Sequence, residues 1–161
     1  MPIFMIRKWE ERNNMLINTK YFGEVEIEES KIIEFEKGII GMPEYKRFIL
    51  IDEKDEKGEK INMMSFLQSV DEFSIAFPVI NPLEIYSEYN PVIDYSEIKF
   101  IGELTENNVA MFTSLNVGNE AKEITTNLKA PFVINTDTYR GVQVIADNSD
   151  YLVKYIVYSA K

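Results

Sequence analysis

The chain has 161 residues, with 27 acidic and 17 basic side chains, a formal net charge of −10, and neither cysteine nor histidine. The length is typical of one domain, and the two absent residue types exclude a disulfide framework, a thiolate nucleophile, a zinc finger and histidine-based acid–base catalysis. The acidic excess argues against direct binding of nucleic acid, which depends on basic side chains that neutralise phosphates.

The sequence predicts neither a membrane span nor export. No apolar run reaches the roughly 20 residues that a span requires. The basic pair Arg7-Lys8 follows the first apolar run, whereas in a signal peptide the basic residues come first. We therefore expect a cytoplasmic protein without membrane contact.

The apolar residues favour strands, because Ile plus Val number 32 and Ala plus Leu only 14. Turn residues such as Asn81-Pro82 and Gly118-Asn119 separate short apolar runs. Strands are predicted, in chain order, over residues 24–28, 31–35, 47–51, 61–67, 74–80, 108–117, 132–135, 141–146 and 151–158. Pro78 indicates that its run is an edge strand or bends there.

The sequence contains few segments with helix signals. One short helix is predicted over residues 94–101, with Asp94 or Ser96 as its N-cap, and another over residues 119–123. The charged run 52–60 reads as a solvated hairpin loop. The predicted fold class is all-β: a small antiparallel β-barrel-like or sandwich domain with one or two short helices.

The first predicted strand alternates without a break. Glu24, Glu26 and Glu28, here called the glutamate row, share one face, and Val25 and Ile27 share the other. Composition alone favours a solvated outer face of a sheet. The alternative is a docking surface for a basic partner, whose approach the like charges would accelerate.

Catalytic patterns are few. Asp71-Glu72 and Asp147 with Asp150 are carboxylate pairs by residue type, and glycosidases use such pairs as acid and base. Segment 147–150 also offers oxygen ligands suited to calcium, but it lacks the Gly and distal Glu of an EF-hand, so a turn fits it better. The alternative function is therefore a carbohydrate-active or metal-dependent enzyme built on a β-barrel.

Several short motifs occur in a fixed order along the chain. They are Thr19-Lys20-Tyr21-Phe22-Gly23, Phe35-Glu36-Lys37-Gly38-Ile39-Ile40-Gly41-Met42-Pro43, Phe66-Leu67-Gln68-Ser69, Ala76-Phe77-Pro78-Val79-Ile80-Asn81-Pro82, Thr126-Asn127-Leu128-Lys129-Ala130-Pro131, Ile134-Asn135 and Gly141-Val142-Gln143-Val144. In this order they resemble the bacterial flagellar assembly factor FliW family, over about residues 16–158. Members of that family usually begin near Leu16, which makes residues 1–14 an N-terminal extension without an assigned role and residues 15–161 a single domain.

The resemblance implies a binding protein and not an enzyme. Proteins of this family bind CsrA, a small RNA-binding translational repressor, and thereby relieve its repression of the flagellin message. They also bind flagellin near its C-terminal end, so that accumulated flagellin releases the repressor. The implied fold is a small antiparallel β-barrel-like domain, and neither a metal nor another cofactor is expected.

Within that resemblance, the glutamate row is expected to steer the repressor toward the chain. Ile39, Ile40 and Met42 would form an apolar anchor if their loop exposes them, and a hairpin cover if it buries them. Asn127 and Asn135 are amides that either satisfy backbone groups at strand ends or face a partner.

Overall fold

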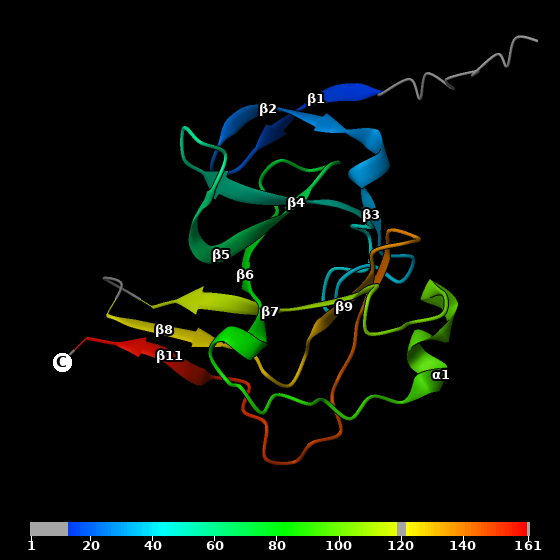
Figure 1. Cartoon of the computed structure of the whole chain (residues 1–161), viewed down its shortest axis with the longest axis vertical. Helices are drawn as coiled ribbons and strands as arrows, with labels where there is room; N and C mark the ends of the chain where they lie inside the picture. The colour runs from blue at the N-terminus through cyan, green and yellow to red at the C-terminus, as the bar shows by residue number, and fades with distance from the viewer. Residues whose placement is uncertain (1–12, 119–121, 161) are drawn as a thin grey trace, which may run out of the picture.

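A computed structural model describes residues 13–118 and 122–160, and strands dominate these residues (Figure 1). The strands are β1 (Asn14–Thr19), β2 (Gly23–Glu28), β3 (Ile33–Glu34), β4 (Arg47–Lys54), β5 (Lys60–Ser69), β6 (Ala76–Ile80), β7 (Val109–Val117), β8 (Glu123–Thr126), β9 (Phe132–Asn135), β10 (Arg140–Gln143) and β11 (Tyr155–Ser159). One short helix, α1 (Tyr95–Ile98), and three 3₁₀ turns, η1 (Glu29–Lys31), η2 (Pro82–Glu84) and η3 (Lys99–Ile101), complete the described elements. This composition confirms the predicted all-β class.

Seven of the strands form a closed barrel. Their order is β7-β6-β5-β4-β3-β10-β9, and β9 pairs back onto β7, where Val109 lies opposite Asn135 and Phe112 opposite Phe132. All of these pairings are antiparallel except the short one between β3 and β10. In the parts of the ring where neighbouring strands are paired over their full length, this closure leaves no strand edge unpaired.

The two halves of β7 have different partners on one edge. Its first half pairs with β9, and its second half pairs with β8 through Leu115, Asn116 and Val117. Strand β11 then pairs with β8, so that β8 and β11 form a two-stranded extension beside the barrel, at the lower left of Figure 1.

The barrel strands contribute one apolar core. Phe35, Phe48, Leu67, Val79 and Phe132 come from the β3–β4 region, β5, β6 and β9, and all are at most 1% exposed. The rings of Phe35 and Phe48 meet edge to face with centroids 5.5 Å apart, an arrangement that adds to the hydrophobic gain. The β-branched and aromatic side chains in the runs therefore pack as the sequence predicts.

A hairpin of β1 and β2 covers the barrel on one side, above β4 and β5 in Figure 1. Ile17 and Ile27 are buried against Ile49 of β4. Because side chains alternate along a strand, burial of Ile27 places the glutamate row on the outer face.

The structure shifts several predicted boundaries. Within the predicted helix over 94–101, α1 and η3 cover residues 95–101, and the Asp94 side chain accepts a hydrogen bond from the Ser96 backbone N–H as the N-cap. The predicted strand over 151–158 begins only at Tyr155, because Tyr151 is buried against Tyr89 before the strand starts. The predicted strand over 31–35 shortens to β3, since η1 occupies its first residue.

Two predictions fall on residues that the structure leaves undescribed. Almost all of the predicted N-terminal extension, residues 1–12, lies outside the described ranges, as do residues 119–121 of the second predicted helix. Within residues 13–118 and 122–160, no helix is long and apolar enough to cross a membrane.

Candidate protein-binding surface

The glutamate row lies on the outer face of the β1–β2 hairpin. Glu24 and Glu26 are exposed and Glu28 is half-buried. Across the hairpin, Glu26 pairs with Leu16, which is 62% exposed. Three carboxylates spaced two residues apart therefore share one outer strand face with an exposed apolar side chain.

Among the residues that the structure describes, no ion pair involves the glutamate row. Asn14 donates a hydrogen bond from Nδ2 to Glu26 Oε1 at 3.0 Å, which orients the central carboxylate without removing its charge. Lys31 donates to the Tyr139 hydroxyl at 3.1 Å, and the pKa of Lys31 is raised by this bond first and by Glu28 to a smaller extent. The face accordingly keeps a negative potential that reaches about 8 Å at physiological salt.

The loop after β3 exposes one of its three predicted anchor residues. Ile40 is 52% exposed, whereas Ile39 is 4% exposed inside the barrel core and Met42 is half-buried. Ile39 and Met42 form an isolated β-bridge, and the Ile40 backbone N–H donates to Gln143 Oε1 at 3.0 Å. Ile39 is buried, as expected if the loop covers the hairpin. Of the three residues, only Ile40 exposes a large apolar side chain that a partner could contact.

Ile40 borders a shallow depression of about 230 Å³. Lys37, Glu97 and Ile145 also line it, and Ile145 is 50% exposed. The mixture of two exposed isoleucines with one charge of each sign is typical of an interface rim and not of a small-molecule pocket.

The two predicted amides have different surroundings. Asn135 is 1% exposed; its Nδ2 donates to the carbonyls of Ile101 and Glu103, and its Oδ1 accepts from the backbone N–H groups of Asp137 and Thr138. These bonds give Asn135 a structural role inside the fold, and no part of it lies at a surface.

Asn127 is half-buried and closes a turn by accepting from the Lys129 backbone N–H at 3.0 Å. It also lines a depression of about 180 Å³ together with Val153 and Lys154. Asn127 is therefore partly accessible, on a different part of the chain from the glutamate row.

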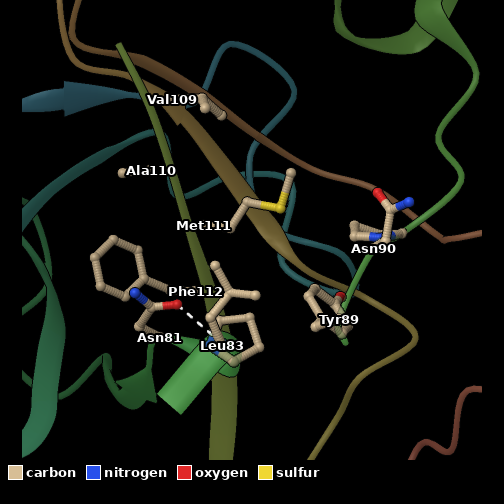
Figure 2. A pocket seen from close by; sticks show the side chains of 10 residues that line it. Asn81, Leu83, Tyr89, Asn90, Val109, Ala110, Met111 and Phe112 are labelled. Atoms are coloured by element: carbon tan, nitrogen blue, oxygen red, sulfur yellow. Dashed lines mark hydrogen bonds between the residues drawn. The ribbon is translucent and has the colours of Figure 1, made fainter. Parts of the chain in front are cut away.

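A groove beside β7 was not anticipated from the sequence (Figure 2). It has a volume of about 350 Å³ and carries no charged lining residue. Its lining residues are Asn81, Pro82, Leu83, Tyr89, Asn90, Pro91, Val109, Ala110, Met111 and Phe112. Figure 2 shows the four β7 side chains along one strand, with Leu83 from η2 and Tyr89 on other segments beside them.

The sequence contains one signal for this groove. Asn81-Pro82 was identified as a turn, and the Asn81 side chain does cap η2 by accepting from the Leu83 backbone N–H at 3.1 Å. The groove lies where β7 extends beyond the end of β6. This difference follows from the register between the two strands, which the sequence alone did not predict.

The carboxylate pairs that would support an enzyme serve other purposes. Asp71 forms an exposed ion pair with Arg47, and Glu72 accepts hydrogen bonds from the Ser74 backbone and hydroxyl. Asp147 and Asp150 are both exposed. Across the described residues, no group of three or more acidic side chains is arranged to hold a metal ion. The geometry therefore does not favour the enzyme alternative.

Comparison with known proteins gives one consistent result. The family model described as FliW protein matches residues 15–157. The chain is 44% identical over 145 residues to the flagellar assembly factor FliW of Lachnoclostridium phytofermentans, covering 89% of this chain and 91% of the relative. It is 40% identical over 145 residues to the protein of the same description from Lachnospira eligens, covering 89% and 95%.

A solved structure agrees with the sequence comparison. The crystal structure of a flagellar assembly factor FliW superposes with a TM-score of 0.80 at 33% identity, covering 91% of this chain and 99% of that chain. The barrel, its hairpin and the extension therefore form a fold already seen in this family.

Proposed function

Because the chain belongs to the FliW family of flagellar assembly factors, we propose that it binds a CsrA-type RNA-binding repressor and flagellin in the cytoplasm. Binding of the repressor relieves translational repression of the flagellin message. Binding of flagellin, through its C-terminal region, makes the factor unavailable to the repressor. The chain acts by holding other proteins and carries out no reaction of its own.

The glutamate row is the observation in this structure that best supports the proposal. An RNA-binding repressor presents basic side chains, since neutralised phosphates supply much of its affinity for RNA. An acidic face on the outside of β2 complements such a surface and raises the encounter rate. The exposed Leu16 beside Glu26 adds the apolar contact that charge alone does not provide.

A competition titration tests the proposal. The full chain is titrated into fluorescently labelled cognate repressor, and flagellin is then added to the preformed complex; the reverse order starts from labelled flagellin. We expect saturable binding of each partner at micromolar concentrations or below, and release of the repressor as flagellin rises. Flagellin without its C-terminal region is the control, and it should release none.

Two results would count against the proposal. Failure of the wild-type chain to bind either partner at micromolar concentrations would exclude the assigned function. Formation of a stable ternary complex would exclude the competition step while leaving the two separate binding activities intact.

A further inference from the structure

Within residues 13–118 and 122–160, one edge of strand β7 has no partner strand next to the groove of Figure 2. On this edge, β6 pairs with β7 only where Ile80 lies opposite Thr113 and Val79 opposite Ser114. From Val109 to Phe112, β7 pairs on its other edge with β9, and no second strand among the described residues flanks it. Four residues of a central strand are therefore paired on one side only.

The register identifies the backbone groups that face the groove. The Thr136 N–H donates to the Asn108 carbonyl, and the Asn127 N–H donates to the Ser114 carbonyl, so even-numbered residues of this segment direct their backbone groups toward β9 and β8. Because these directions alternate along a strand, Val109 and Met111 direct their N–H and C=O groups the other way, into the groove. An added strand would find two donors and two acceptors at strand spacing.

The chain itself explains why this edge is open. Asn81 and Pro82 follow the end of β6, and η2 turns the backbone aside, with the Asn81 side chain capping the turn by accepting from the Leu83 N–H. A segment that continued the line of β6 would lie antiparallel to β7 and fill the groove. The four open residues span about 13 Å, enough for a strand of four to five residues.

The walls indicate the chemistry of the occupant. The side chains that line the groove are apolar or neutral, and Leu83 is 54% exposed. Both walls lie in a stretch of sequence, residues 62–121, whose only basic residue is Lys99. Its acidic residues include Glu84 and Glu88, which are exposed and flank the lining residues in the sequence. An apolar segment that carries a basic residue matches these walls in polarity and in charge.

We propose that the groove beside β7 binds an extended, apolar peptide segment with at least one basic residue, which pairs its main chain with Val109 and Met111. This is recognition by strand addition, in which main-chain hydrogen bonds give affinity and the walls select side chains. The inference rests on the proposed function only in treating the chain as a protein-binding factor. It concerns a surface distinct from the glutamate row.

Selection from a random library of displayed ten-residue peptides tests this proposal on the full chain without assuming any partner. The disruptive variant is Leu83→Lys, which replaces an exposed apolar side chain of the groove wall by a positive charge that repels the basic residue of the peptide. The matched control is Leu152→Lys, since Leu152 is 56% exposed and does not line the groove. We expect selected peptides to be apolar with a basic residue, to keep their affinity for Leu152→Lys and to bind Leu83→Lys about tenfold or more weakly.

Main-chain pairing is tested with synthetic copies of the strongest selected peptide, methylated at single backbone nitrogens. Methylation at two alternate positions should weaken binding roughly fivefold or more, and methylation at the intervening position should leave it unchanged, because only every second amide faces β7. The amides of Val109 and Met111 should become protected from hydrogen exchange in the complex.

The inference is wrong if no peptide is enriched, if enriched peptides bind Leu83→Lys as well as wild type, or if methylation shows no alternation. Each of these results leaves the repressor and flagellin titrations unaffected. Conversely, if neither the repressor nor flagellin binds in its titration but peptides still bind the groove, the proposed function is wrong and the proposed peptide site stands.

Discussion

Asn135 holds together segments that no strand pairing connects. Its side chain joins the end of β9 to the carbonyls of Ile101 and Glu103, next to η3, and also fixes the turn at Asp137 and Thr138. A buried polar group without its partner costs more free energy than an ordinary hydrogen bond gains. The residue therefore matters for stability and not for partner contact.

Replacement of Asn135 by alanine is expected to lower the free energy of unfolding by about 2–4 kcal/mol, because two backbone N–H groups lose their side-chain acceptor and the carbonyls of Ile101 and Glu103 each lose one of two donors. The control is Asn127→Ala, which removes one turn bond at a half-buried site and should cost about 1 kcal/mol. Urea denaturation of both variants measures the difference. Equal losses for the two variants would contradict the structural role of Asn135.

Asp94 makes the short helix sensitive to acid. Its Oδ1 accepts from the Ser96 hydroxyl and N–H, and these bonds, the hydroxyl first, hold the pKa of Asp94 below its ordinary value of 3.8. Since the pKa is lower in the folded chain, the stability that Asp94 contributes is present above the unfolded pKa. It is lost as the pH falls through the folded pKa.

The stability difference between wild type and Asp94→Asn should therefore shrink as the pH falls from about 5 to about 2. Asparagine keeps an acceptor at the cap but does not titrate. The difference between Asp94→Asn and Asp94→Ala, which compares two non-titrating caps, should stay constant over the same range. Urea denaturation at each pH provides the values, and a constant difference between wild type and Asp94→Asn would refute the linkage.

The loop between β3 and β4 contains two glycines with positive φ, Gly38 and Gly41, and a side chain would meet a steric clash only at Gly38. Gly38 has φ of +68°, and a Cβ there would lie 2.5 Å from Pro43 Cα. Gly41 has φ of +85°, but a Cβ there would meet nothing within 4 Å. A side chain at position 41 would therefore cost only backbone strain. A side chain at position 38 would also clash with the backbone of Pro43.

Gly38→Ala is expected to destabilise the chain by at least about 3 kcal/mol, because positive-φ strain and a backbone clash act together. Gly41→Ala should cost about 1–2 kcal/mol from the strain alone. The loop also carries Ile39 into the core, so Gly38→Ala should lower the cooperativity of thermal unfolding as well. If Gly41→Ala proves as costly as Gly38→Ala, the close approach to Pro43 is not what restricts the loop.

The elements that the sequence predicted well are those set by local pattern. Residues 24–28 alternate, and β2 shows the predicted faces; Asp94 precedes a helix and caps it. The start of β11 was misplaced because Tyr151 stacks on Tyr89 with ring centroids 5.0 Å apart, a contact between residues 62 positions apart in the sequence. Such a contact outweighs the strand propensity of the run.

The candidate surfaces were likewise predictable only where a local sequence pattern determines them. Alternation alone placed the glutamate row outside, as the hairpin shows. It did not separate Ile39 from Ile40, because their exposure depends on how one loop enters the core. The groove beside β7 depends on which strand ends first, which is a property of the register between β6 and β7 and has no local signature.

At the scale of the whole molecule, charge is the property most relevant to the proposed binding. The net charge is −10, and the ion pairs seen between described residues, such as Arg47 with Asp71 and Arg140 with Glu36, are exposed and contribute little to stability. The chain thus carries a negative field that a basic partner senses before contact. The glutamate row is one local part of this field, and variants can separate its effect from that of the net charge.

Neutralising the glutamate row with Glu24→Gln, Glu26→Gln and Glu28→Gln together is expected to slow association with the repressor by about tenfold at low salt. The Debye length falls from about 30 Å at 0.01 M salt to about 8 Å at 0.15 M. The wild-type association rate should therefore decline steeply over this range, and the triple variant should show a much flatter dependence. Stopped-flow fluorescence with labelled repressor measures both rates.

A second triple variant controls for net charge. Glu53, Glu56 and Glu59 are exposed around the β4–β5 turn, and changing all three to Gln alters the total charge by the same amount. If the position of the charges matters, this variant should keep most of the wild-type rate and salt dependence, since nearby charges dominate once screening is appreciable. Equal slowing by both variants would show that the repressor responds to the overall field, and an unchanged rate for the glutamate-row variant at low salt would remove that row from the binding mechanism.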